Sequence, residues 1–119
     1  VAVIAGTTGL DAAQEAELAA AARHVPIVYA ANMSLGVNLL LALVEQAAAR
    51  LSGDRFDIEI VEMHHAAKAD APSGTALLLR QAMQEAGYAR TIDMASTRAG
   101  FIPGTHEVGF DGAAETVSW

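Results

Sequence analysis

The chain contains no cysteine among its 119 residues, so disulfide bonds and thiol chemistry contribute nothing to its stability or function. Basic residues are scarce: seven Lys and Arg stand against 14 Asp and Glu, which gives a net charge of -7. This balance argues against a nucleic-acid partner, which would require a basic face.

Long hydrophobic runs are also missing. The longest, residues 39–44, is far shorter than the roughly 20 apolar residues that cross a bilayer, so we expect no membrane partner. The sequence does not begin with the basic segment, apolar core and cleavage site of a signal peptide, so a cytoplasmic location is the default expectation. Aromatic residues make up 5% of a chain that is 53% hydrophobic, which predicts a core of alanine and aliphatic side chains in one ordinary domain's length.

The first third has the pattern of a strand, a helix and a second strand. Residues 1–4 and 25–30 are short apolar strand candidates. Between them, Asp11 and Gln14 have the spacing of a capping box that begins an alanine-rich helix ending at Arg23. This order is typical of the trailing unit of a doubly wound parallel sheet.

The remaining chain predicts two helices and a second sheet. The spacing predicts a helix over 35–51, ended by Ser52-Gly53-Asp54. One apolar face would hold Leu40, Val44, Ala47 and Leu51, broadened by Leu39 and Leu43. Residues 92–98, 104–110 and 115–119 are strand candidates separated by Gly and Pro, which favours an antiparallel or mixed sheet.

The most informative segment follows the alternating strand pattern of residues 56–61. His64 and His65 emerge where this strand ends, and neighbouring strand residues point to opposite faces, so we expect the two histidines to have different roles. Lys68 adds a positive charge that can bind an anion or donate a proton beside an imidazole.

A helix start completes this segment. Pro72 keeps Ala71 out of helical geometry, and Ser73-Gly74-Thr75 would form the first turn of a helix that ends at Gly87. Its buried face would consist of Ala76, Leu79, Met83 and Ala86. The unpaired amides of a first turn and the helix dipole favour a carboxylate or phosphate. We expect these amides to share a cavity with His64 and Lys68.

Simpler interpretations exist for each feature alone. Ser-Gly-Thr after a proline is an ordinary helix cap, and a single lysine is usually solvated. Two adjacent histidines without cysteine or an evident third ligand fit a zinc site poorly, so we predict no metal. The coincidence of these features in one strand-loop-helix turn favours the anion site.

The run Glu62-x-His64-His65-x-x-Lys68-x-Asp70-Ala71-Pro72-Ser73-Gly74-Thr75-Ala76 resembles the signature of the dihydrodipicolinate reductase family, nicotinamide-dependent enzymes of the diaminopimelate route to lysine. Gly6-Thr7-Thr8-Gly9 is similar to the family's cofactor loop, and Ala30-Ala31-Asn32-Met33-Ser34-Leu35-Gly36-Val37-Asn38 to the segment that joins its two domains. The similarity continues through Arg98-Ala99-Gly100, Pro103-Gly104-Thr105-His106 and Val108-Gly109-Phe110.

The resemblance implies roles for individual residues. His64 would be the catalytic histidine and Lys68 the general acid, while His65, Ser73, Gly74 and Thr75 would bind the two carboxylates of an unsaturated heterocyclic substrate. The nicotinamide end of NADH or NADPH would be lined by Gly6, Thr7, Thr8, Ala30, Ala31, Asn32 and Met33.

The resemblance also implies an organisation. Residues 1–33 would be the trailing part of a Rossmann-like dinucleotide-binding domain, and residues 34–119 an incomplete α+β domain for substrate binding and oligomerisation, assembling as a homotetramer. The Gly-x-Gly-x-x-Gly fingerprint and the family's later strand and closing helix are absent, so we expect this chain to be inactive alone. Met33 replaces an expected aromatic residue, a milder departure that still allows an apolar contact. The alternative is a non-catalytic assembly module that binds a dicarboxylate or phosphate. We expect Phe110 and Trp119 in the core and a structural role for His106.

Overall fold

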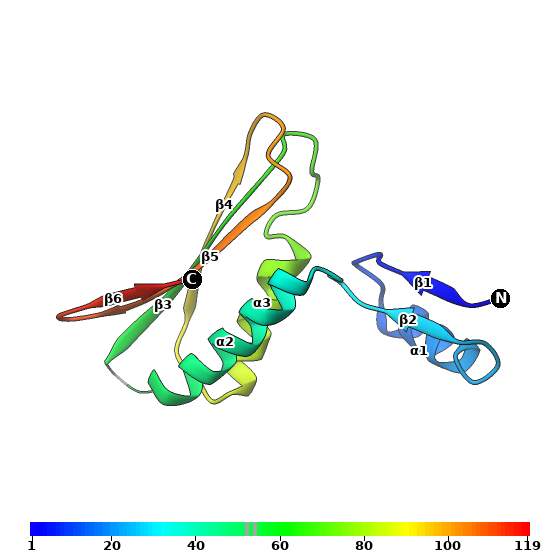
Figure 1. Cartoon of the computed structure of the whole chain (residues 1–119), viewed down its shortest axis with the longest axis horizontal. Helices are drawn as coiled ribbons and strands as arrows, with labels where there is room; N and C mark the ends of the chain where they lie inside the picture. Colours follow the sequence, from blue (N-terminus) through cyan, green and yellow to red (C-terminus); the bar gives the residue numbers. More distant parts are fainter. Residues whose placement is uncertain (52, 54) are drawn as a thin grey trace.

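A computed structural model describes residues 1–51, 53 and 55–119. Two sheets organise these residues (Figure 1): β1 and β2 form a parallel pair, and the other four strands form a mixed sheet in the order β4-β3-β5-β6. In chain order the elements are β1 (Val3–Ala5), α1 (Ala12–Ala21), β2 (Ile27–Tyr29), α2 (Leu35–Leu51), β3 (Phe56–His64), α3 (Gly74–Glu85), β4 (Ile92–Arg98), β5 (Thr105–Gly112) and β6 (Thr116–Ser118).

The N-terminal unit consists of β1, α1 and β2, which confirms the predicted strand-helix-strand order. The predicted capping box is also present: the Asp11 carboxylate accepts the Gln14 N–H, and the Gln14 side chain accepts the Asp11 N–H, both at 2.9 Å. Helix α1 ends at Ala21, two residues earlier than predicted. None of its residues, all of which the structure describes, is buried.

The second part of the chain is a mixed sheet with both remaining helices packed on one face. Strand β3 lies between β4, to which it is parallel, and β5, to which it is antiparallel. The parallel pairing requires a crossover, which α3 supplies. Helices α2 and α3 lie side by side against the sheet (Figure 1). The core between the helices and the sheet is formed by Val44, Ala48, Ile58, Ile60, Ala76, Leu79, Met83, Tyr88, Ile92, Val108 and Phe110.

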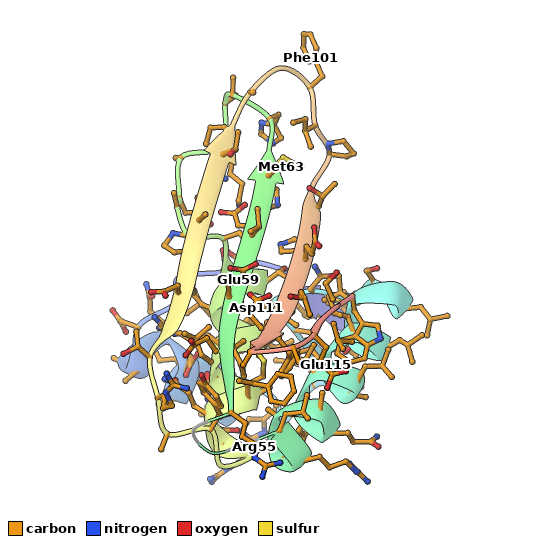
Figure 2. The ribbon with its side chains drawn as sticks, turned by 90° about the vertical axis from the view of Figure 1, so that its left-hand side faces the viewer. Arg55, Glu59, Met63, Phe101, Asp111 and Glu115 are labelled. Atoms are coloured by element: carbon orange, nitrogen blue, oxygen red, sulfur yellow. The ribbon has the colours of Figure 1, made fainter. Side chains whose placement is uncertain are left out.

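Strand β3 alternates between a buried and an open face over its whole length. Ile58 and Ile60 face the core, and the same phase buries Glu62 and His64. Val61 and Met63 point to the opposite side, where no element of the described chain covers them. Figure 2 looks onto this open face, with Glu59 and Met63 labelled along β3.

Helix α2 has the predicted bounds, but its buried stripe is narrower than predicted. Val44 and Ala48 are buried, and Leu40, Leu41, Ala47 and Leu51 pack against the core. Leu39 and Leu43 instead stay 60% and 39% exposed. At about 100° per residue these two leucines fall outside the stripe that meets the core. Ser52 and Asp54, which we predicted to end the helix, lie outside the described residues.

Helix α3 confirms its predicted face, since Ala76, Leu79 and Met83 are buried. Ser73 is its N-cap rather than part of the first turn, and the helix ends at Glu85, just before Gly87 with φ +109°.

The two aromatic residues expected in the core, Phe110 and Trp119, differ in how deeply they are buried. Phe110 is fully buried, as predicted, whereas Trp119 is 43% exposed because it follows the edge strand β6. The Trp119 ring meets Phe110 edge-on, with 5.7 Å between the ring centroids.

Candidate active site

A cavity of about 330 Å³ lies where the N-terminal unit meets the start of α3. It brings together ten of the predicted site residues and one residue that we did not predict, Pro103. The lining residues are Gly6, Thr8, Ala31, Asn32, His64, His65, Lys68, Ser73, Gly74, Thr75 and Pro103. The expected shared cavity for the histidines, the lysine and the helix start is therefore present.

Three predicted residues are missing from the described lining: Thr7, Ala30 and Met33. The Thr7 hydroxyl instead donates to the Thr8 carbonyl at 3.5 Å, and the Ala30 N–H donates to the Ala5 carbonyl at 3.2 Å. Met33 is 47% exposed, at the centre of the turn in which the Asn32 Oδ1 accepts the Ser34 N–H at 2.8 Å.

Two close contacts join the N-terminal unit to α3. The Asn32 Nδ2 donates to the Thr75 Oγ1 at 2.9 Å. A Cβ atom at Gly74 would lie 3.1 Å from the Thr8 Cγ2, so a glycine permits the close approach. Because the Thr75 hydroxyl accepts from Asn32, its own hydrogen remains available for a ligand.

The start of α3 offers donors to an anion. The Ser73 side chain accepts the Ala76 N–H at 3.2 Å, and the Ser73 N–H donates to the Glu62 Oε1 at 3.1 Å. Among the described residues, the N–H groups of Gly74 and Thr75 have no hydrogen-bond partner. Together with the positive end of the helix dipole, these groups can bind a carboxylate or phosphate.

A buried carboxylate lies behind the cavity. Glu62 is 1% exposed, and its oxygens accept hydrogen bonds from the Arg98 Nη1 at 2.9 Å and Nη2 at 2.7 Å. Burial by itself would raise the pKa of Glu62. The hydrogen bonds from Arg98, Ser96, His64 and the Ser73 N–H outweigh it and lower this pKa to about 2. Glu62 is therefore ionised at neutral pH.

His64 joins this carboxylate to the cavity. Its Nδ1 lies 2.5 Å from the Glu62 Oε2, and its Nε2 faces Gly104, where an added Cβ would lie only 2.9 Å away. The His106 ring meets the His64 ring edge-on at 5.2 Å, and the His106 Nε2 lies 3.1 Å from the Ser73 Oγ. Burial, and next the charge of His64, lower the pKa of His106, so it is neutral at pH 7. His106, predicted to be structural, therefore also borders the site.

Lys68 and His65 form the more exposed side of the cavity. The Lys68 Nζ lies 2.7 Å from the Asp70 Oδ1, and this hydrogen bond lowers the pKa of Asp70. The ammonium is thus held in place by a carboxylate that is about half exposed. Strand β3 ends at His64, so strand alternation does not separate the two histidines, and both line the cavity. They differ in their surroundings, since only His64 is buried.

The sequence prediction did not assign roles to Glu62, Arg98, Pro103 or Gly104. A signal for Glu62 was present: it follows Ile58 and Ile60 in the same period-two phase, on the face that also carries His64. Arg98 has no such signal, because only the parallel pairing of β3 with β4 brings it beside Glu62.

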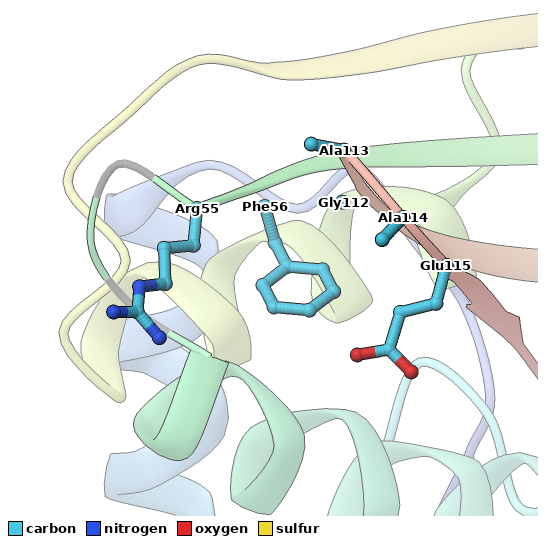
Figure 3. A pocket seen from close by; sticks show the side chains of 6 residues that line it. All are labelled: Arg55, Phe56, Gly112, Ala113, Ala114 and Glu115. Carbon is cyan, nitrogen blue, oxygen red and sulfur yellow. The ribbon is translucent and has the colours of Figure 1, made fainter.

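A second, larger cavity of about 440 Å³ lies under the β5–β6 turn (Figure 3). Figure 3 shows the Phe56 ring between the side chains of Arg55 and Glu115, below residues 112–114. Phe56 pairs with Gly112, where a Cβ would lie 2.8 Å from the ring. This cavity contains none of the predicted site residues, so we assign the site to the smaller one.

Within residues 1–51, 53 and 55–119, every helix is too short or too polar to span a membrane. The fold and site define a two-part α/β protein with a cavity lined by hydrogen-bond donors at the carboxyl ends of a parallel strand pair, where such folds bind ligands. The family model of the dihydrodipicolinate reductase N-terminus matches residues 1–33, and that of the dihydrodipicolinate reductase C-terminus matches residues 36–119. The chain therefore belongs to the dihydrodipicolinate reductase family.

Comparisons with individual relatives support this family assignment. The chain is 51% identical to the 4-hydroxy-tetrahydrodipicolinate reductase of Methylocella silvestris, over 94% of this chain and 48% of the relative. It is 47% identical to 4-hydroxy-tetrahydrodipicolinate reductase 1 of Mesorhizobium japonicum, over 97% of this chain and 49% of the relative. A solved structure, the dipicolinate-bound dihydrodipicolinate reductase from Paenisporosarcina sp. TG-14, is similar with a TM-score of 0.68 and 27% identity, over 99% of this chain and 51% of that one.

The chain spans about half the length of the curated relatives that it matches. Within that half it is also shorter than they are. The alignment to the Methylocella protein runs over 134 residues, more than the 119 that this chain contains, so the relative carries additional residues inside the matched span.

Proposed function

We propose that this chain is the part of a 4-hydroxy-tetrahydrodipicolinate reductase that binds the substrate and the nicotinamide end of the cofactor. The reaction is hydride transfer from NADH or NADPH to an unsaturated heterocyclic dicarboxylate, in diaminopimelate and lysine biosynthesis. One observation carries the proposal: His64, Lys68 and the free amides of Gly74 and Thr75 line one cavity in a chain of this family.

The donors of the cavity suit a doubly charged ring. The amides of Gly74 and Thr75 and the Thr75 hydroxyl, with Ser73 as cap, would bind one carboxylate, and His65 would bind the other. The Paenisporosarcina relative carries dipicolinate, a ligand of this chemical class. Preorganised donors of this kind stabilise negative charge that the ring gains during reduction.

His64 and Lys68 would handle the proton that accompanies the hydride. The Lys68 ammonium can donate a proton to the reduced ring, and Asp70 keeps it oriented. The His64 imidazole lies on the same cavity and can exchange or hold a proton there. Both side chains would touch the reacting ring.

The residues present fit the nicotinamide end of a cofactor. Gly6 and Thr8 follow β1, and Ala31 and Asn32 follow β2, so all four lie at the carboxyl ends of parallel strands. A Cβ added to Gly6 would meet nothing within 4 Å, which leaves the main chain open to a flat ring. The bound cofactor would supply the hydride. The resemblance assigns Thr7, Ala30 and Met33 to the same end of the cofactor, although they are not among the described residues that line the cavity.

We further propose a division into a cofactor unit, residues 1–33, and a substrate and assembly unit, residues 34–119. A homotetramer would form through the open sheet face, where Val61 and Met63 are 36% and 37% exposed (Figure 2). The biosynthetic role of the family supports a cytoplasmic location.

Calorimetric titration of the 119-residue chain with pyridine-2,6-dicarboxylate tests the pocket. We expect binding that weakens when Thr75 or His65 is replaced by Ala, and no comparable binding of inorganic phosphate. A preference for phosphate would favour the phosphate-binding alternative, and unchanged affinity in both variants would contradict the assigned donors.

Fluorescence titration with NADH tests the cofactor end. Binding of the dicarboxylate without NADH would favour the non-catalytic assembly module. In a chain extended to the length of its relatives, we expect His64→Gln and Lys68→Ala each to lower kcat by about two to four orders of magnitude. Near-normal kcat in either variant would contradict the catalytic roles.

A further inference from the structure

Glu62 makes hydrogen bonds to groups on three different elements. The Arg98 guanidinium at the end of β4 donates to both of its oxygens, at 2.9 and 2.7 Å. The Ser73 N–H at the cap of α3 donates to Oε1 at 3.1 Å, and the His64 Nδ1 at the end of β3 lies 2.5 Å from Oε2. Arg98 is fixed in turn by the Asp70 carbonyl, which accepts from its Nη2 at 2.6 Å.

The charge of Glu62 determines where the hydrogen of His64 lies. An ionised carboxylate only accepts hydrogen bonds, so the His64 Nδ1 must be the donor of the bond between them. A neutral imidazole carries one ring hydrogen. With that hydrogen on Nδ1, the His64 Nε2 is left as the unprotonated nitrogen.

The surroundings of His64 keep the opposite end of the ring accessible. Gly104 adopts φ +139° beside Nε2, and a Cβ there would lie 2.9 Å from Nε2 and 3.1 Å from Cδ2. The other titratable or charged groups near His64 include Arg98, which is paired with Glu62, and Lys68, which is paired with Asp70. They also include the neutral His106 and the adjacent His65, which lines the same cavity. None of these described groups competes with Glu62 for Nδ1.

We propose that Glu62 is a positioning residue that holds His64 as its Nδ1–H tautomer and so makes Nε2 the atom that exchanges a proton in the cavity. The carboxylate also stabilises the imidazolium that forms when Nε2 gains a proton, as a carboxylate behind a catalytic histidine does. The catalytic consequence rests on the proposed function, whereas the tautomer is a property of this chain by itself.

Nitrogen-15 NMR of the histidine-labelled 119-residue chain measures the tautomer directly. The chemical shifts of Nδ1 and Nε2 distinguish a protonated from an unprotonated ring nitrogen, and His64→Gln identifies the signals among the four histidines. At a pH at which the ring is neutral, we expect hydrogen on Nδ1 of His64. Hydrogen on Nε2 would overturn the proposal, and this measurement needs no variant of Glu62.

Glu62→Gln removes the ionised acceptor, and we expect a loss of the single tautomer in the same spectrum. Glu59→Gln is the matched control, because it makes the same change on the same strand but on the open face. It should leave the His64 signals unchanged. A His64 spectrum that is the same in Glu62→Gln and in the unaltered chain would also overturn the proposal.

In a chain of full length, we expect Glu62→Gln to lower kcat about 10- to 100-fold with little change in KM, the effect typical of groups that orient a functional histidine. A raised KM with unchanged kcat would show a merely structural role. Failure to bind pyridine-2,6-dicarboxylate in the unaltered chain would contradict the proposed function while leaving the tautomer result standing.

Discussion

The N-terminal unit and the mixed-sheet part differ in how much apolar surface they bury. In the N-terminal unit Ile4 is 74% and Val28 56% exposed, whereas Ile60 and Val108 in the mixed-sheet part are fully buried. The radius of gyration, 16.2 Å, exceeds the value of about 13.5 Å expected of one compact domain of this length. Within this chain, most of the buried apolar surface therefore lies in the mixed-sheet part, which we expect to supply most of the stability.

The candidate site depends on both regions. The mixed-sheet part contributes the charged and donor groups, and the N-terminal unit closes the cavity through Thr8 and Asn32. The contacts to Gly74 and Thr75 described above join the two regions at this place. Variants that act on one region alone can therefore test the difference.

The largest expected effect compares the same substitution in each region. Ile60→Ala should lower the free energy of unfolding by about 2 to 5 kcal/mol, because it leaves a cavity in a fully buried position. Ile4→Ala should change it by less than about 0.5 kcal/mol, since this side chain is largely exposed. Urea denaturation followed by circular dichroism measures both. Equal losses would show that the two regions share one core.

Acid should destabilise the mixed-sheet part through Glu62. The pKa of Glu62 is lowered from 4.5 to about 2, so its carboxylate stabilises the fold above pH 4.5, and this contribution is lost as the pH falls towards 2. The shift corresponds to roughly 3 kcal/mol. Urea denaturation at a series of pH values should show this loss in the unaltered chain and in Glu59→Gln, but not in Glu62→Gln. A parallel pH dependence in all three would exclude Glu62 as the cause.

A smaller effect is expected at the contact between the regions. Asn32→Ala removes the hydrogen bond to Thr75 and should weaken binding of pyridine-2,6-dicarboxylate by about 0.5 to 1.5 kcal/mol in calorimetry. Glu17→Ala is the control, because Glu17 is an exposed residue on α1 of the same unit and does not line the described cavity. An equal loss of affinity in the control would mean that any change in the N-terminal unit weakens binding, and that the hydrogen bond from Asn32 to Thr75 has no specific effect.

The smallest effect on overall stability is expected from Asp11→Ala. Loss of the capping box should cost α1 about 1 kcal/mol of local helix stability, because α1 depends on its cap rather than on a buried face. Hydrogen exchange should accelerate in residues 12–21, while the midpoint of global unfolding stays the same. A shifted midpoint would show that α1 belongs to the cooperative core.

Strong periodicity made parts of the fold predictable from sequence. Leu35–Leu51 and Ile92–Arg98 were predicted with the bounds observed, and the alternation of β3 was predicted from residues 56–61. The width of the buried face of α2 was not predictable from sequence, because it depends on the shape of the surface against which the helix packs.

The residues that line the cavity were largely found from one continuous motif and one resemblance. The group behind the cavity was missed. A glutamate is usually exposed, and Glu62 is buried because Arg98, 36 residues later in the sequence, pairs with it. His106 was likewise interpreted as structural, since only the fold places it against His64 and Ser73.

Helix α3 has two roles in this molecule. Its first turn offers donors to the cavity, and its flank, through Leu79 and Met83, fills the core. Substitutions that disturb the packing of Leu79 or Met83 should therefore weaken ligand binding, even though these side chains do not line the described cavity. A screen for second-site suppressors of a weakened Thr75 should then recover substitutions that repack the helix, as well as changes inside the pocket.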